Sequence, residues 1–560
     1  MTIAIRSILT LALVAPALPA DLLLTNGRIW TADPAHPWTA TLAITGNRIS
    51  GYQSEPAKTT IDLKGAFAMP GFNDAHIHFL GGSLGLFEVD LTGACSIPEM
   101  QSRVKKFAEA NPSQPWIAGN GWEYACVPGG LPKKEDLDAV VPGRPVFLRA
   151  YDGHSAWANS KALALAAITK KTRYDGFGEI VKDPQTGEPT GALKEGASGL
   201  VSRLLPKPDR ARQLEALRKG LALAASLGIT SMQNASGDES LVSLYEELAA
   251  RGELTSRTAI ALSAGPGRAE EVCRRAAELS RKHTGPLLKV AAVKFMLDGV
   301  IESYTAGMLE PYANKPGDTG RLAWPEDAYK KAIAACDAFG LQIYTHAIGD
   351  RAIRLALDAY QAVKAENRNQ RHRIEHIETL HPADLPRFAQ LGVLPSFMPI
   401  HADPGTVEVW SAAVGEKRLP LAFAWRALEQ TAARLVFSSD WPASISVDPI
   451  RGLHNAVNRQ TVKGFPTGGW LPAQRVSLET ALAAYTANGA YASFEENTKG
   501  RLRPGMLADM VVLSEDPTRI PAARLHQLKV TRTIFDGRVI YETATPARPA
   551  QTLPGPGTPP

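Results

Sequence analysis

Residues 70–78 read Pro-Gly-Phe-Asn-Asp-Ala-His-Ile-His, and this stretch opens the α/β body of the chain. Alternate side chains of a strand point to the same face, so His76 and His78 are predicted to point the same way. Neutral imidazole binds zinc and similar divalent ions well, and two such rings can share one ion. A lone His-X-His pair also arises by chance on exposed strands. Here the preceding Pro-Gly and Asp74, which could fix a histidine tautomer, favour a metal site.

Downstream of this stretch, short β-rich runs alternate with helical hydrophobic patterns. Besides the run ending near His76, candidate strands lie at 146–150, 229–233, 290–296, 341–346, 372–377, 393–397 and 434–438. The clearest helical patterns lie at 209–227, 325–339 and 349–365. Strand–helix alternation predicts a parallel sheet, and eight units predict an α/β fold with a closed (β/α)8 TIM-type barrel. Long insertions are expected over the barrel mouth between residues 80 and 290.

Both ends of the chain differ from this body. Short strands broken by Asn-Gly and Gly-Asn turns fill residues 21–66, and a second β-rich stretch occupies residues 486–543. We therefore expect a small β-sandwich domain assembled from both ends, beside a barrel that spans residues 67–485. Residues 544–560 are rich in Pro, Ala, Gly and Thr and are predicted to form a disordered tail.

The first twenty residues read as a cleavable signal peptide. Arg6 supplies the positive start, residues 8–14 supply the apolar stretch, and a small-residue cleavage site follows Ala17 or Ala20. This pattern predicts a periplasmic or secreted protein whose mature form has no membrane span. A buried N-terminal strand or a membrane-anchored tail is the alternative interpretation.

The net charge argues against one class of partner, and the cysteine spacing argues against a cysteine metal site. A net charge of +5 on 560 residues, without a basic run, argues against a nucleic-acid partner. The four cysteines share no metal-binding spacing; they are Cys95, Cys126, Cys273 and Cys336. An exported protein could pair some of them, and the connectivity stays open. Cys336 falls on the apolar face of a helix, and we expect it to be a buried free thiol.

Three further candidate ligands each end a different predicted strand. His346 ends the run at 341–346, His376 lies in the run at 372–377, and Asp440 follows the last run. The carboxyl ends of barrel strands converge on one mouth, so residues distant in sequence can meet there. A single histidine near a strand end is more often structural, but an ordered set of this kind favours a shared site.

The ordered set resembles the amidohydrolase superfamily, in the branch that includes N-substituted formamide deformylase (amidohydrolase family 3). The resemblance runs from Asn26-Gly27-Arg28 to Leu507-Ala508-Asp509 and includes Asp152-Gly153-His154-Ser155-Ala156-Trp157 and Thr345-His346-Ala347-Ile348-Gly349-Asp350. It implies a His-X-His on strand 1, a lysine on strand 4, histidines on strands 5 and 6, and an aspartate on strand 8. These metal-binding roles fall on His76, His78, Lys294, His346, His376 and Asp440.

Lys294 lies in an otherwise apolar strand, Ala291-Ala292-Val293-Lys294-Phe295-Met296. Burial lowers the pKa of a lysine, and a neutral amine can react with CO₂ to give a carbamate that bridges two cations. The alternatives are a lysine that reaches solvent or one paired with Asp298 or Glu302. The resemblance leaves open whether one or two ions bind; zinc is the first candidate.

The resemblance implies a metal-dependent hydrolase that attacks a non-peptide carbon–nitrogen bond of a small molecule with metal-activated hydroxide. Asp440 would serve as ligand and as catalytic base. Ester hydrolysis on the same scaffold, or a non-catalytic protein that binds a small molecule beside a stabilising metal, are the alternatives. A homodimer is the candidate oligomeric state.

Substrate-pocket candidates come from the predicted mouth of the barrel. His154 could bind the substrate or its tetrahedral intermediate, and Asp350 could orient His346 or cap the following helix. Tyr304 is a third candidate for substrate binding. Packed or solvated roles are at least as plausible for the remaining candidates, which are Glu195, Arg321, Trp122 and Trp441.

Overall fold

The computed structural model describes residues 19–364 and 369–543. The predicted tail at 544–560 and residues 1–18 of the predicted signal peptide lie outside these ranges. Ala20 begins the first strand, is fully buried, and pairs with Ala57. Cleavage after Ala17 would keep this pairing residue, whereas cleavage after Ala20 would remove it. In the described part of the chain, no helix combines the length and the apolar character needed to cross a membrane.

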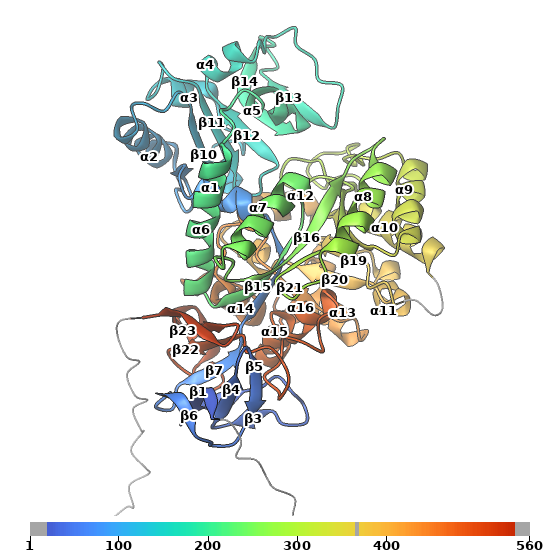
Figure 1. Cartoon of the computed structure of the whole chain (residues 1–560). Coiled ribbons are helices and arrows are strands. Elements are labelled where there is room, and N and C mark those ends of the chain that lie inside the picture. Colours follow the sequence, from blue (N-terminus) through green and yellow to red (C-terminus); the bar gives the residue numbers. More distant parts are fainter. Residues whose placement is uncertain (1–18, 365–368, 544–560) are drawn as a thin grey trace, which may run out of the picture.

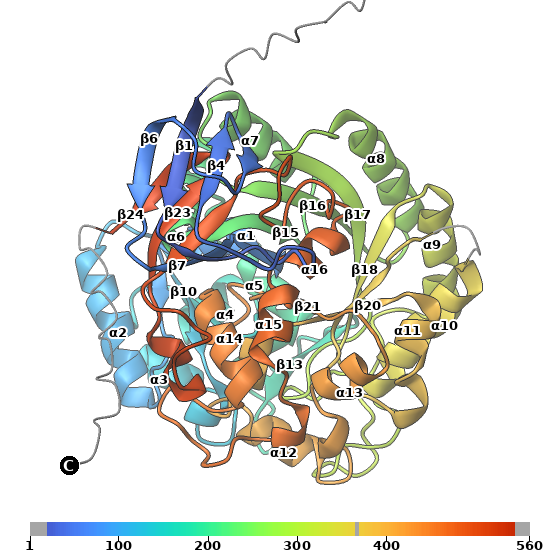
Figure 2. The same cartoon turned by 90° about the horizontal axis from the view of Figure 1, so that it is seen from below.

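Eight parallel strands form a sheet that nearly closes into a barrel (Figures 1 and 2). In chain order these strands are β8 Phe72–Ile77, β15 Ile229–Asn234, β16 Arg257–Ala264, β17 Leu288–Met296, β18 Gln342–Ala347, β19 Arg373–His376, β20 Leu394–Phe397 and β21 Val436–Phe437. Backbone hydrogen bonds from Asp440 N to His76 O and from His78 N to Trp441 O, both 2.8 Å, connect the two edges of the sheet. The residues that follow β21 are thereby held against the end of β8.

Two of the strand expectations differ from this barrel. Residues 146–150 form a strand, but it belongs to a separate sheet, and the missing barrel strand is β16 at 257–264. A buried run of five residues looks alike in either sheet, so the assignment of 146–150 to the barrel was wrong. The β16 sequence, Arg-Thr-Ala-Ile-Ala-Leu-Ser-Ala, is rich in alanine, which has low β-propensity.

An inserted unit between β8 and β15 carries the six-stranded sheet β13-β14-β12-β11-β10-β9. Its strands are β9 Val89–Asp90, β10 Ile117–Trp122, β11 Val146–Ala150, β12 Ser155–Ala158, β13 Gly178–Lys182 and β14 Pro189–Glu195. Figure 1 shows this unit at one end of the barrel, with the strands from the chain termini at the opposite end. The sequence predicted long insertions over the barrel mouth between residues 80 and 290, and this unit lies within that range.

The chain termini form two further sheets, with strand orders β5-β4-β1-β6 and β24-β23-β22-β7-β2-β3. Their strands are β1 Ala20–Thr25, β2 Arg28–Trp30, β3 Trp38–Thr39, β4 Leu42–Thr45, β5 Arg48–Gly51, β6 Ala57–Asp62, β7 Phe67–Pro70, β22 Met510–Leu513, β23 Val530–Phe535 and β24 Arg538–Glu542. Antiparallel pairing of β22 with β7 joins the two distant segments, with Met510 opposite Pro70. Residues from both ends thus share one apolar cluster that includes Leu24, Leu42 and Val512.

Helices surround the barrel sheet on the outside (Figure 2), whereas α2 to α5 belong to the inserted unit (Figure 1). Their bounds are α1 Phe79–Gly85, α2 Ile97–Ala110, α3 Lys134–Asp138, α4 Ser160–Leu165, α5 Gly199–Ser202, α6 Arg210–Ser226, α7 Glu239–Ala250, α8 Ala269–Lys282, α9 Glu326–Ala338, α10 Asp350–Val363, α11 Arg387–Leu391, α12 Glu408–Val414, α13 Trp425–Gln430, α14 Pro449–Asn458, α15 Leu478–Ala484 and α16 Ala487–Ala492. The three helices expected from sequence periodicity correspond to α6, α9 and α10.

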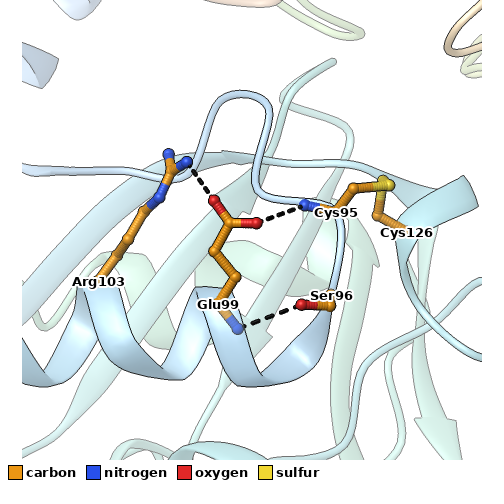
Figure 3. The surroundings of a disulfide bond; sticks show 5 residues. All are labelled: Cys95, Ser96, Glu99, Arg103 and Cys126. Carbon is orange, nitrogen blue, oxygen red and sulfur yellow. Dashed lines mark hydrogen bonds and ion pairs between the residues drawn. A yellow bond between two sulfur atoms is a disulfide. The ribbon is translucent and has the colours of Figure 1, made fainter.

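Two disulfides join the four cysteines, Cys95 with Cys126 and Cys273 with Cys336. The expectation of a free thiol at Cys336 is therefore wrong. Cys273 lies on α8 and Cys336 on α9, and these neighbouring helices pack together, which brings the two Cα atoms to 5.1 Å. The other disulfide lies in the inserted unit beside α2. There Ser96 caps Glu99 N, and the Glu99 carboxylate accepts from Cys95 N (Figure 3).

Candidate metal centre

All six predicted ligands come together at one end of the barrel. Asp440 Oδ1 lies 3.2 Å from His76 Nε2 and 3.1 Å from His78 Nε2, and Asp440 Oδ2 lies 3.8 Å from His376 Nδ1. Lys294 Nζ is 3.2 Å from His76 Nε2, and the His346 and His376 rings are 4.4 Å apart between centroids. They come from five strands or the residues just after them, so the parallel barrel assembles this cluster, as the sequence order predicts.

The backbone is strained where two of these residues leave their strands. His376 has φ +76° and Asp440 has φ +60°, in the left-handed region that non-glycine residues rarely adopt. Such conformations cost of order 1–3 kcal/mol each and persist only where the surrounding structure enforces them. The surrounding structure therefore enforces both conformations, and both side chains lie in the shared cluster.

A buried carboxylate fixes the tautomer of His76. Its Nδ1 lies 2.6 Å from Glu375 Oε2, so Nδ1–H donates to the carboxylate and the lone pair of the neutral ring resides on Nε2. Arg373 donates to both oxygens of Glu375. Although burial opposes the charge, Arg373 and His76 hold the pKa of Glu375 well below its usual range. The Nε2 lone pair therefore faces the carboxylate of Asp440, an arrangement that calls for a cation between them.

The other rings are oriented in the same manner. His346 donates from Nε2 to the carbonyl oxygen of Gly299 at 3.1 Å, which leaves Nδ1 free to bind a metal. His78 Nδ1 lies 2.8 Å from Ser236 Oγ. His376 Nδ1 and Asp440 Oδ1 are buried without a hydrogen bond among the described residues. Unpaired buried acceptors are costly, so these atoms fit a bound divalent ion.

Lys294 is 2% exposed and has no carboxylate within ion-pair distance among the described residues. Burial lowers its pKa to about 8, against the opposing effect of Glu375 and Asp440. The alternative partners are engaged elsewhere: Asp298 accepts from Gly307 N and Gly349 N, and Glu302 accepts from Tyr151 Oη. The structure does not show the alternative pairing of Lys294.

Two residues near the cluster, His401 and Asp298, were not among the predicted site residues. His401, in the turn after β20, lies with His376 and Asp440 in a second group able to hold an ion. Its Nε2 donates to Ala443 O at 3.0 Å. The buried carboxylate of Asp298 lies 3.6 Å from His346 Nε2, and burial raises its pKa to about 8. Both follow predicted strands, and Asp298 was considered from the sequence only as a partner of Lys294.

Among the pocket candidates, His154 lies beside the cluster and Glu195 contacts His154. The His154 ring is 5.2 Å from the His346 ring, and its Nδ1 is 2.9 Å from Glu195 Oε2. Burial disfavours charge on His154, but Glu195 outweighs it and raises the pKa of His154 to about 10. Asp350 begins α10 and accepts from Leu309 N, so it does not orient His346; Asp298 lies beside that ring instead.

The remaining candidates have other surroundings. Tyr304 and Arg321 line a separate open pocket with Lys194 and Lys315. Trp122 is fully buried and donates to Leu148 O. Trp441 packs edge-on against Phe79 of α1.

A family model described as the amidohydrolase family matches residues 59–541, most of the chain. The chain belongs to the amidohydrolase family. This amidohydrolase is 30% identical over 527 residues to Protein LONG AFTER FAR-RED 3 of Arabidopsis thaliana, covering 90% of this chain and 89% of the relative. It is 27% identical over 555 residues to N-substituted formamide deformylase of Arthrobacter pascens, covering 93% of this chain and 98% of the relative.

A solved structure supports the same assignment. An uncharacterized metal-dependent hydrolase from Pyrococcus horikoshii OT3 superposes with a TM-score of 0.71 at 26% identity, covering 90% of this chain and 99% of the other. Family membership, first inferred from the ordered motifs, is thus confirmed, and the amidohydrolase is a hydrolase by family.

Proposed function

We propose that this amidohydrolase cleaves a non-peptide carbon–nitrogen bond of a small molecule with the help of a divalent metal, zinc being the first candidate. Its ligands would be His76, His78, Lys294, His346, His376 and Asp440. The observation that carries the proposal is the convergence of imidazole lone pairs and carboxylate oxygens on one buried space, with His376 Nδ1 and Asp440 Oδ1 unpaired. Coordination of a cation would satisfy both atoms.

A divalent ion bound here would lower the pKa of a water molecule toward neutrality and polarise the scissile carbonyl. Asp440 is placed to handle the proton. Its two oxygens face His76 and His78 on one side and His376 on the other. In the proposal, Asp440 accepts the proton of the attacking water and delivers it to the leaving nitrogen.

Lys294 would join the ligand set as a carbamate formed with CO₂. Its burial and lowered pKa make the neutral amine accessible near neutral pH, and only the neutral amine reacts with CO₂. The carbamate is an anion, so it would replace the positive charge that the ammonium form places beside the imidazoles. The ligand set then carries the negative charge that one or two divalent ions need.

The proposed bond class rests on the activity for which one relative, N-substituted formamide deformylase, is named, together with the hydroxide chemistry described above. Fold alone does not fix the substrate. We also propose that the protein is exported to the periplasm or the medium. The two terminal sheets are proposed to pack as a sandwich.

The test begins with elemental analysis of protein purified in bicarbonate, followed by a screen of N-acyl, N-formyl and cyclic amides and matched esters, with and without chelator. Stoichiometric metal and chelator-sensitive amide hydrolysis are expected. Activity that survives verified metal removal would contradict the mechanism. Full metal content without turnover of any amide or ester would favour a binding protein instead.

A further inference from the structure

Asp440 presents its two carboxylate oxygens to two different pairs of histidines. Its Oδ1 lies 3.2 Å from His76 Nε2 and 3.1 Å from His78 Nε2. Its Oδ2 lies 3.8 Å from His376 Nδ1 and 3.8 Å from His401 Nε2. Each pair forms with Asp440 a group whose ligand atoms all lie within 4.8 Å of one another. One carboxylate therefore lies between two groups that could each hold a cation.

The distances in the second group suit a bound metal ion. Two atoms that bind one zinc ion, each about 2.1 Å from it, are at most roughly 4.2 Å apart. Both 3.8 Å separations from Asp440 Oδ2 lie within this limit. The two histidine nitrogens lie within 4.8 Å of each other, so a small rotation of one ring would close the group around an ion. His376 Nδ1 is buried without a hydrogen bond among the described residues, so this ligand atom has no competing partner.

A buried carboxylate lies beside the other nitrogen of the His401 ring. Glu378 Oε1 is 3.5 Å from His401 Nδ1, and Glu378 Oε2 accepts from Trp410 Nε1 at 2.7 Å. Metal-binding histidines usually donate their second ring nitrogen to a carboxylate or a carbonyl. Coordination through Nε2 would place the ring proton on Nδ1, which faces Glu378, and would replace the contact of Nε2 with Ala443 O. His401 thus has both a coordinating nitrogen near Asp440 and the partner that such a ligand needs.

We propose that His401 and His376 bind a second divalent cation, which Asp440 bridges to the first ion. The first ion is the one held by His76 and His78. The second is zinc or a similar divalent metal, because its ligands are again imidazole nitrogens and a carboxylate oxygen. His401 is then a seventh ligand, outside the six that the family resemblance implies. The inference rests on the proposed function, since the cluster is taken as the metal centre of the hydrolase.

This arrangement differs from one in which a carbamate on Lys294 is the only bridge between two ions. Asp440 offers one oxygen to each group without any modification of the chain. The second ion should therefore bind in the absence of bicarbonate. An ion that depends on the carbamate should instead be lost when bicarbonate or the lysine is removed. The responses to changes at His401 and at Lys294 separate the two arrangements.

Zinc binding tests the proposal without requiring turnover. Zinc is titrated calorimetrically into the chelator-treated full-length protein in bicarbonate-free buffer, and elemental analysis after gel filtration counts the retained ions. Wild type should bind two ions per chain. H401Q should keep the first ion and bind the second at least about tenfold more weakly, and E378Q should weaken the second about 10- to 100-fold. H36Q, the same exchange on the exposed surface, should match wild type.

Anomalous diffraction at the zinc edge from wild-type crystals needs no variant. It should show one ion at His76 and His78 and another in contact with His401. A single ion in wild type, or H401Q with two ions at wild-type affinity, would overturn the proposal. Loss of the second ion in K294M but not in H401Q would assign that ion to the carbamate and also overturn it. Failure of the proposed function appears differently, as zinc-loaded wild type without turnover in the amide and ester screen.

Discussion

Glu375 and His76 are joined by a 2.6 Å contact although 299 positions separate them in the chain. Both side chains are fully buried, and Arg373 holds the carboxylate from its other side. Glu375 thus fixes the orientation of the His76 ring through Nδ1, the nitrogen that does not face Asp440. A substitution of Glu375 therefore tests how ring orientation affects metal affinity without removing a predicted ligand.

Replacing Glu375 by glutamine should weaken metal binding about 10- to 100-fold, the usual effect of losing a carboxylate behind a ligating histidine. The substitution also leaves Arg373 buried without its charge partner, so the free energy of unfolding should fall by about 3–5 kcal/mol. Chelator competition and chemical denaturation measure the two effects. E270Q, on the exposed side of α8, is the control. Unchanged metal affinity in a folded E375Q protein would remove His76 from the ligand set.

Asp440 should be required for turnover beyond its contribution to metal binding. In D440N the amide cannot serve as base, and kcat should fall at least about 100-fold, the lower end of typical general acid–base contributions. Metal content by elemental analysis, at saturating zinc, separates lost chemistry from lost metal. D327N on the exposed start of α9 is the matched control. A zinc-loaded D440N enzyme with wild-type kcat would refute the assigned role.

The site was more predictable than the strands that build it. His346 and His376 end parallel strands, and such ends converge on one mouth whatever the insertions between them. The strands that belong to the barrel were harder to predict. A buried run at 146–150 pairs equally well in an inserted sheet, and the alanine-rich β16 carries a weak strand signal.

Contacts made by residues in loops and helices could not be predicted from the spacing of residue types along the sequence. His401 is a single histidine after β20, and only the folded chain shows its ring stacked 5.8 Å from that of His376. Cys273 and Cys336 are 63 residues apart and meet because α8 and α9 flank successive barrel strands. In both cases the tertiary packing creates a relationship that no local pattern encodes.

The metal-free protein should become more stable as pH rises from 7 to 9 because of Lys294. Its pKa is lowered to about 8 in the folded protein, from 10.5 for an unperturbed lysine. Between these two pKa values, Lys294 is protonated in the unfolded chain but largely neutral in the folded protein. The free energy of unfolding therefore rises as the pH rises through the folded pKa, because the folded protein no longer carries a buried charge. Relative to K294M, wild type should gain about 1 kcal/mol of unfolding free energy over this range.

Denaturation with a chelator present at each pH measures this gain. K289M, on a half-buried lysine of the same strand β17, is the control. A constant difference between wild type and K294M would show that Lys294 stays protonated, which would also weaken the case for a carbamate. A rise in bicarbonate-dependent metal loading over the same pH range would strengthen it.

Removing the Cys95–Cys126 disulfide should destabilise the inserted unit selectively. The bond closes a loop with a sequence separation of 31 residues, and such cross-links typically contribute about 2–4 kcal/mol. Cys126 ends the turn Tyr124–Cys126, whose Tyr124 hydroxyl donates to Asp152 beside His154.

In the C95S/C126S double variant, amide hydrogen exchange should therefore accelerate across β10 and the His154 turn while the barrel strands keep their protection. C273S/C336S, which removes the bond between α8 and α9, should show the opposite distribution. Equal acceleration throughout both variants would mean that the inserted unit and the barrel unfold as one cooperative body.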